Sequence, residues 1–143
     1  MIRMKNPDER SAWAFDLDGC LVGMLAMSDL RPLARDVLEH LRAAGIPVVV
    51  WSAGGAAYAR RVAERVGIAG LIDGFYDKVR GPEGRWLLDG FAPHHWPTVC
   101  VDDEPADVPE TVRTVGVSPY LGRHPHDRGL QAILDELAPR SGV

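Results

Sequence analysis

Two carboxylates lie one residue apart near the start of the chain, at Asp16 and Asp18, and Gly19 follows them directly. The apolar residues 12–15 in front of them are typical of a buried strand that ends at this point. If the chain turns at Gly19, Asp18 leaves the alternation of the strand and can face the same substrate as Asp16. Such a pair suits phosphoryl transfer in which one carboxylate is the nucleophile and a metal ion assists.

Two further apolar runs also end in reactive groups. Residues 98–101 precede Asp102 and Asp103, and residues 46–51 precede Ser52. Because ligands of open α/β sheets bind outside the carboxyl ends of the strands, these groups are predicted to line one crevice with the first acidic pair. Four aspartates in one crevice repel one another by roughly several kcal/mol unless a cation lies between them. The sequence therefore predicts a Mg²⁺ site, because Mg²⁺ prefers oxygen ligands and keeps part of its water.

The composition is that of a folded globular protein. The 143 residues are 46% hydrophobic and 25% charged, and we expect one domain over residues 1–143 in which residues 1–11 form an N-terminal extension. The formal net charge of −4 gives no global attraction to nucleic acid or to acidic membranes. The first residues contain no apolar stretch of signal-peptide or membrane-span length, so we expect a cytoplasmic protein without membrane contact.

Predicted strands and helices alternate along the chain, which favours a doubly wound, three-layer α/β/α fold around a central parallel sheet of five strands. Besides the strand over residues 12–15, we expect strands at 46–51, within 71–79, at 99–102 and at 115–121. Pro119 favours an edge position for the last of them. The expected helices run from Ser28 to a stop at Gly45, over 56–66, over 105–114 and over 127–137, and residues 80–97 are expected to form an ordered loop with at most one helical turn.

Four motifs in this order resemble the haloacid dehalogenase superfamily of phosphotransferases. They are Asp16-Leu17-Asp18-Gly19, Trp51-Ser52, a cation near Lys78, and Asp102-Asp103, and the resemblance covers residues 12–121. In this family the first Asp becomes an aspartyl phosphate, so the resemblance implies that Asp16 is the nucleophile. The second Asp protonates the leaving oxygen and then activates water, a role that falls to Asp18. The resemblance also implies that Mg²⁺ is held by Asp16, the backbone carbonyl of Asp18 and Asp102, with Asp103 as a ligand or as the orienter of one.

The resemblance further implies how a phosphoryl group is held. Ser52 is expected to hydrogen-bond a phosphate oxygen, helped by the backbone N–H groups of Ala53 and of the next helix start. A third-motif cation is expected to reach the phosphoryl oxygens and the nucleophile; we favour Lys78, with Arg80 close behind and Arg85 as another candidate. The expected catalytic residues are thus Asp16, Asp18, Ser52 and Lys78, and the expected phosphate ligands are Ser52, Ala53, Lys78 and Arg80.

The segments between the motifs are too short for a cap domain. The resemblance is therefore to capless members, whose open sites often accept phosphate groups on proteins or nucleic acids. It implies a Mg²⁺-dependent phosphatase that hydrolyses phosphate monoesters of a phosphorylated substrate. No recognisable pattern in the sequence encodes the leaving group or an oligomeric state.

Two other functions are weighed against this one. A non-catalytic domain of the same fold could serve as a binding module, although the presence of both Asp16 and Asp18 speaks against it. A phosphoacceptor domain of the response-receiver type also combines Asp with Mg²⁺ in a five-stranded α/β unit. There the acidic pair comes first, the acceptor Asp ends the third strand and the Lys comes last, which is the opposite of the order found here.

The remaining reactive side chains lie in predicted loops. His94, His95, His124 and His126 invite a zinc interpretation, but no acidic or Cys partner stands at ligand spacing. Cys20 and Cys100 likewise lack the spacing of a zinc site or a disulfide framework. A substrate rim around the open site is a second hypothesis for some of these loop residues, formed by Arg85, His94, His95, Arg123 and His124.

Overall fold

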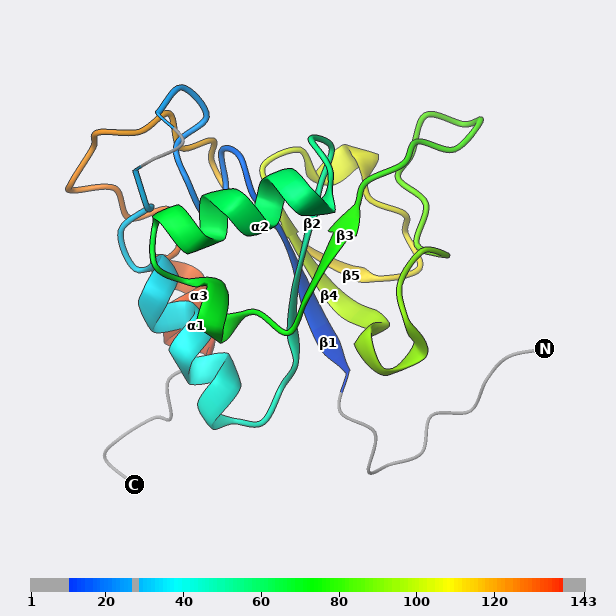
Figure 1. Ribbon diagram of the computed structural model, residues 1–143, viewed down its shortest axis with the longest axis horizontal. Coiled ribbons are helices and arrows are strands. Elements are labelled where there is room, and N and C mark those ends of the chain that lie inside the picture. The colour runs from blue at the N-terminus through cyan, green and yellow to red at the C-terminus, as the bar shows by residue number, and fades with distance from the viewer. Residues whose placement is uncertain (1–10, 27–28, 138–143) are drawn as a thin grey trace.

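A parallel sheet of five strands forms the centre of this computed structural model, which describes residues 11–26 and 29–137 (Figure 1). The strands are β1 (Ala12–Asp16), β2 (Val48–Ser52), β3 (Gly74–Asp77), β4 (Pro97–Asp102) and β5 (Arg113–Gly116). They lie in the order β3-β2-β1-β4-β5, and every neighbouring pair is parallel. The predicted α/β fold with a central parallel sheet is confirmed. Residues 1–10 of the expected extension and the expected helix start at Ser28 lie outside the described residues.

Three helices, α1 (Ala34–Ala43), α2 (Ala56–Arg65) and α3 (Gln131–Leu137), cover one face of the sheet (Figure 1). Each turns apolar side chains at helical spacing toward the sheet. The buried members of these stripes are Ala34, Val37, Leu38 and Leu41 of α1, Ala59, Val62 and Ala63 of α2, and Ile133 of α3. They pack in one cluster with Phe15, Val50 and Val101 of the central strands. Each large aliphatic side chain buried in this way contributes roughly 1.5–3 kcal/mol.

Loops and short 3-10 turns form the layer on the opposite face. Trp51 and Cys100 belong to a second buried cluster there, and Trp86, Phe91 and Val108 of the connecting segments pack against them. These segments contain the 3-10 turns η2 (Pro93–His95) and η3 (Pro105–Asp107). The ordered loop expected over residues 80–97, with its single helical turn at η2, is thus present.

The helix expected over residues 105–114 is wrong, because only η3 is helical in that stretch. Pro109 follows Pro105 at the distance of one helical turn, lacks the N–H that an α-helix needs and would clash with the carbonyl of the preceding turn. The chain instead enters the sheet early, where Arg113 of β5 pairs with Val99 of β4. The expected strand at 115–121 therefore begins earlier and ends at Gly116, and Pro119 lies beyond it.

Two helices begin later than their apolar patterns predict. Leu33 has a φ of 72°, which no helix continues, so α1 begins only at Ala34. Asp127 accepts hydrogen bonds from the side chain of Arg31 and from the backbone N–H of Gly129, and α3 begins only after this turn, at Gln131. In both places a local backbone or side-chain contact competes with the helix.

The strand order reverses between β1 and β4. The chain passes from β1 outward through β2 to β3 and then returns to the other side of β1, where β4 and β5 follow. In α/β proteins, ligands bind at such a reversal point, outside the carboxyl ends of the two central strands. Asp16 ends β1 and Asp102 ends β4, so two carboxylates lie at this reversal point. Across the described ranges, 11–26 and 29–137, none of the helices is long and apolar enough to cross a membrane.

Candidate active site

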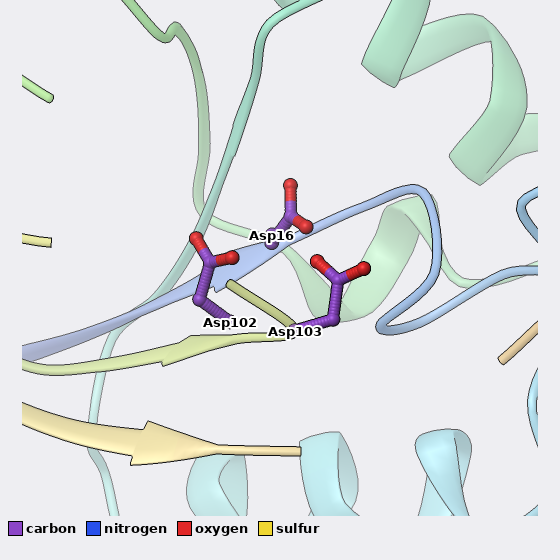
Figure 2. A group of neighbouring side chains, drawn as sticks. All are labelled: Asp16, Asp102 and Asp103. Atoms are coloured by element: carbon purple, nitrogen blue, oxygen red, sulfur yellow. The ribbon is translucent and has the colours of Figure 1, made fainter. Parts of the chain in front are cut away.

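Three carboxylates meet at the reversal point of the sheet. One oxygen each of Asp16, Asp102 and Asp103 lies within 4.8 Å of the others, and Figure 2 shows the three side chains next to one another at the ends of β1 and β4. The pairing of Phe15 with Val101 in the two strands places the residues that follow them side by side. Asp16 and Asp102 are buried, whereas Asp103 is partly exposed. This acidic cluster, defined as Asp16, Asp102 and Asp103, has the oxygen donors that a hard divalent cation prefers.

Lys78 reaches the acidic cluster from the other side of β2. Its Nζ donates to Asp16 Oδ1 at 3.1 Å and to Asp102 Oδ2 at 2.7 Å. Its backbone N–H donates to the carbonyl of Ser52, which extends the pairing of β3 with β2 by one more residue. This anchor fixes the start of the lysine side chain, and the four-carbon stem then crosses the end of β2.

Two indole rings enclose the Lys78 ammonium. Its Nζ lies 5.0 Å from the ring centroid of Trp51 and 4.9 Å from that of Trp86, both within the range of a cation–π contact. Burial by itself lowers the pKa of Lys78, but the charges and hydrogen bonds of Asp16 and Asp102 outweigh it and leave the pKa raised. The ammonium is therefore held charged in a buried position.

The other two candidate cations form ion pairs outside the acidic cluster. Arg80 pairs with Asp107 at 3.2 Å and stacks on Trp86, with its Cζ 4.2 Å from the ring centroid. Arg85 pairs with Glu110 at 3.5 Å. Of the three cations weighed from the sequence, the structure brings only Lys78 into contact with the carboxylates.

Crowding and burial disfavour the ionised form of these acids. Burial is the largest cause that raises the pKa of Asp16 to about 8, and the neighbouring Asp103 and Asp102 raise it further while Lys78 lowers it. Burial also raises the pKa of Asp102, against the opposing effect of Lys78. With Asp18 nearby, four carboxylates thus face one ammonium, and a divalent cation would offset the excess negative charge.

Asp18 lies beside the acidic cluster and has a partner that the sequence analysis missed. The hydroxyl of Tyr58 donates to Asp18 Oδ1 at 2.9 Å. Burial raises the pKa of Asp18, the Tyr58 hydrogen bond opposes this, and Asp103 adds to it. Tyr58 stands in the first turn of α2, and Gly54 leaves room for it, because a Cβ at Gly54 would lie 2.7 Å from the tyrosine ring. The adjacent Gly54 and Gly55, separated from Ser52 only by Ala53, were the available sequence signal.

Ser52 ends β2 in a buried position next to Lys78. Its Oγ accepts a hydrogen bond from the N–H of Gly54 at 3.1 Å, which leaves the hydroxyl hydrogen to donate. Ala53 is exposed in the turn that follows. The first N–H of α2, on Ala56, donates to Asp77 Oδ1 at 2.6 Å and is thus already used within the protein.

The histidines do not join the acidic cluster. His95 lies against Gly74 and donates to, or accepts from, the hydroxyl of Tyr76 at 2.6 Å. Because η2 directly precedes β4, His94 and His95 lie at the amino end of the sheet, opposite the carboxylates, and cannot belong to a rim around them. His124 and His126 are exposed in the segment before α3. Within the described part of the chain, the acidic cluster is the one group of three or more His, Cys, Asp or Glu side chains close enough to hold a metal ion.

The fold and the site together define an α/β protein with a buried acidic cluster that can bind a metal ion. No protein-family model and no curated protein matches its sequence. Solved structures do match in three dimensions. A chain in a structure of the Pnkp1/Rnl/Hen1 RNA repair complex has a TM-score of 0.55 at 16% identity, over 84% of this chain and 46% of that one. A chain in another structure of the Pnkp1/Rnl/Hen1 complex gives 0.53 at 17% identity, over 82% of this chain and 49% of that one.

A further crystal structure matches with a TM-score of 0.56 at 18% identity, over 88% of this chain and 80% of that one. At such identities the likeness shows the fold alone. The chain spans less than half the length of the two matched chains from the repair complex.

Proposed function

We propose that this chain is a Mg²⁺-dependent phosphatase of the capless haloacid dehalogenase type, which hydrolyses phosphate monoesters through an aspartyl phosphate. The observation that carries the proposal is the buried Lys78 ammonium, which contacts both Asp16 and Asp102 while Asp103 completes the acidic cluster. A carboxylate is a weak nucleophile toward a negatively charged phosphoryl group, so attack requires concentrated positive charge at this point. The receiver-type alternative requires its acceptor at the end of β3, where Asp77 instead binds the N–H of Ala56.

The residues at the site fit Mg²⁺. Asp16, Asp102 and Asp103 offer hard oxygen donors, and burial, with a smaller effect of the neighbouring carboxylates, raises the pKa of both Asp16 and Asp102. The ion would be held by Asp16, the backbone carbonyl of Asp18 and Asp102, with Asp103 as a ligand or as the orienter of one. When bound, Mg²⁺ supplies positive charge that offsets the phosphoryl oxygens and favours the ionised carboxylates.

In the proposed reaction, each side chain of the site has its own role. Asp16 attacks the phosphorus atom and forms an aspartyl phosphate, while the bond to the leaving oxygen breaks and that oxygen takes a proton from Asp18. Asp18, now ionised, removes a proton from water, whose oxygen attacks the phosphorus, so inorganic phosphate leaves and the Asp16 carboxylate is restored. Lys78 and the Ser52 hydroxyl hold the phosphoryl oxygens. The raised pKa of Asp18 supports its role as the acid of the first step.

Phosphate groups exposed on macromolecules are the proposed substrates. The described residues between β1 and α1, and between β3 and β4, form loops close to the sheet and contain no cap. Two of the matched structures contain an RNA repair complex, which favours a nucleic-acid end as the first substrate class to test. A phosphoprotein is the other class that an open site accepts.

The test is release of inorganic phosphate from an aryl phosphate, from oligonucleotides with 3′- or 5′-phosphate ends and from phosphopeptides, with Mg²⁺ or with EDTA. We expect Mg²⁺-dependent release by the wild-type protein, and its loss in Asp16→Asn with the fold retained by circular dichroism. Activity that survives in Asp16→Asn contradicts the proposed nucleophile. No release from any of these substrates, together with tight binding of a phosphorylated one, supports the binding-module alternative.

A further inference from the structure

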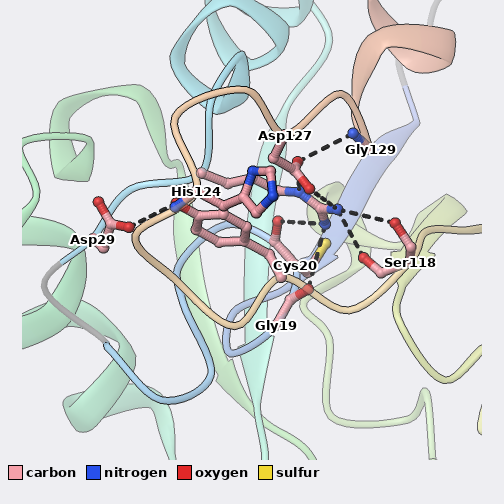
Figure 3. Close-up of polar contacts among 9 residues, drawn as sticks. Gly19, Cys20, Asp29, Ser118, His124, Asp127 and Gly129 are labelled. Carbon is pink, nitrogen blue, oxygen red and sulfur yellow. Dashed lines mark hydrogen bonds and ion pairs between the residues drawn. The ribbon is translucent and has the colours of Figure 1, made fainter.

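Arg31 is a fully buried arginine outside the acidic cluster, with a relative exposure of 1%. It lies in the segment between β1 and α1, and its guanidinium donates to two parts of the chain that are distant in sequence. Figure 3 labels these partners, Asp127 and Ser118 from one part and Gly19 and Cys20 from the other. A buried charge of this kind is costly unless all of its hydrogen bonds are satisfied. Its position therefore requires a dedicated set of partners.

The first set of partners belongs to the segment that precedes α3. Nε donates to Asp127 Oδ2 at 2.7 Å and Nη2 to Asp127 Oδ1 at 3.3 Å, a two-pronged contact that a lysine cannot form. Nη2 also donates to the carbonyl of Ser118 at 2.7 Å. Gly129 provides the space, because a Cβ there would lie 1.9 Å from Nη2. The segment 118–129 is thus folded around this guanidinium.

The second set of partners belongs to the turn that follows Asp18. Arg31 Nη1 donates to the carbonyls of Gly19 at 3.4 Å and Cys20 at 3.3 Å. The Gly19 carbonyl also accepts from the N–H of Tyr120 at 2.8 Å. The third guanidinium nitrogen, Nη1, therefore holds the turn that follows Asp18.

The same turn touches the acidic cluster on its other side. Gly19 has a φ of 81°, and a Cβ on it would lie 2.6 Å from Asp103 Oδ2. The turn is therefore confined between Arg31 on one side and the Asp103 carboxylate on the other. A shift of the turn by a fraction of an ångström therefore moves Asp18, which precedes it. The same shift moves the Gly19 backbone, which lies next to the Asp103 carboxylate.

We infer that Arg31 is a positioning residue for the site: through the carbonyls of Gly19 and Cys20 it fixes the turn that sets Asp18 and Asp103 around the cation. Its geometric effect on the acidic cluster stands on the contacts above, whereas its effect on turnover rests on the proposed function. Asp127 and Gly129 act together with Arg31. Asp127 orients the forked guanidinium group through two hydrogen bonds, and Gly129 leaves room for that group.

The experiment compares wild-type protein with Arg31→Lys, which keeps the charge but loses the fork, and with Asp127→Asn, which keeps the shape of the partner. The control is Ile68→Val, a change of a buried side chain just after the C-terminal end of α2. It tests whether a loss of stability alone lowers kcat or Mg²⁺ affinity. For both test variants we expect a fall in kcat of roughly 10- to 100-fold with little change in KM, and a rise of similar size in the Mg²⁺ concentration for half-maximal activity. Mg²⁺ binding is also measured directly by calorimetry at a temperature where all variants are folded.

Wild-type kcat and Mg²⁺ affinity in a folded Arg31→Lys protein overturn the inference, as does an equal loss in Ile68→Val at matched thermal stability. If Arg31→Lys does not fold, Asp127→Asn and Gly129→Ala decide by the same two measurements, because the alanine displaces the fork without removing it. If the wild-type protein releases no phosphate from any substrate, the proposed function fails. The calorimetric comparison then decides on Arg31 alone: weaker Mg²⁺ binding in the variants supports its role, and equal binding refutes it.

Discussion

The Lys78 ammonium lies 3.1 Å from Asp16 and 2.7 Å from Asp102, so a single cation bridges the last residues of the two central strands. Both carboxylates are buried, so the attraction of the ammonium is less screened than at the surface, while desolvation of the carboxylates opposes it. The arrangement joins β3, at the edge of the sheet, to β1 and β4 across the end of β2.

Lys78→Met is expected to reduce turnover strongly and to destabilise the metal-free protein. Removal of one partner of a buried ion pair costs about 3–5 kcal/mol, and under the proposed function, in which Lys78 holds the phosphoryl oxygens, loss of its charge costs about 10²- to 10³-fold in kcat. Added Mg²⁺ should restore part of the stability, because it replaces the missing positive charge, but not the activity. Phosphate release and chemical unfolding, each with and without Mg²⁺, check this.

Arg85→Met is the matched control, since Arg85 forms an exposed pair with Glu110. Its activity should remain within about twofold of wild type, as is usual for an exposed ion pair. A greater loss in Arg85→Met than in Lys78→Met would reassign the third-motif cation.

The stability of the metal-free protein should fall as the pH rises from about 4 to about 8. Burial raises the pKa of Asp16 from an ordinary 3.8 to about 8, so between these values the folded state holds a proton that the unfolded state has released. Mg²⁺ binds the ionised carboxylates, and its stabilising effect should therefore increase with pH over the same range. Thermal unfolding at several pH values, in EDTA and in Mg²⁺, measures both trends.

The control for this titration is Asp16→Asn, which has no proton to exchange at that position. Its unfolding in EDTA should depend less on pH than that of the wild type. A wild-type stability that rises with pH across this range would show that Asp16 is ionised in the metal-free fold.

Tyr58→Phe is expected to impair the acid step more than the attack. The Tyr58 hydroxyl orients Asp18 and lowers its pKa, so its removal raises the pKa of Asp18 and frees the carboxyl to rotate. General acid catalysis contributes about 10²- to 10⁴-fold, and we expect part of this, roughly tenfold, to be lost with alkyl phosphates. An aryl phosphate, whose leaving group needs little protonation, should lose less. Equal losses on both substrates would assign Tyr58 a structural role only.

Gly54→Ala should reproduce this defect without a change at Tyr58 itself. The added Cβ would lie 2.7 Å from the tyrosine ring and must displace it, whereas a Cβ at Gly70 meets no atom within 4 Å. Displacement of a catalytic partner by about 1 Å can cost 10²-fold, so kcat should fall in Gly54→Ala and stay at the wild-type level in Gly70→Ala. A wild-type kcat in Gly54→Ala would show that the ring can shift without effect on Asp18.

The meeting of Asp16, Asp102 and Asp103 was predictable from the sequence, because parallel strands end at the same edge of a sheet and the apolar runs of β1 and β4 both end at an acid. The α/β class and the helices on one face followed from the same alternation, whereas the second face is covered by loops and 3-10 turns. The position of these three carboxylates could thus be predicted from little more than the periodicity of the apolar residues.

Contacts made by side chains from elsewhere could not be predicted in this way. Arg31 stands between Leu30 and Pro32 like any exposed charge before a helix, and only the folded segment around Asp127 buries it. Tyr58 lies on an ordinary helical stripe, and its partner Asp18 is set by the turn at Gly19. Such contacts depend on tertiary packing, which has no period in the sequence.

The loops and 3-10 turns that cover the second face of the sheet carry Trp86, one of the two rings that enclose Lys78. Segments without regular hydrogen-bond ladders open with a smaller free energy than packed helices and strands. On heating, this side of the molecule should therefore separate from the sheet first and release the ammonium into water while the helical side remains intact. Inactivation by heat would then precede the loss of helical circular dichroism, and amide exchange in residues 86–96 and 105–108, which flank β4, would report the same early opening.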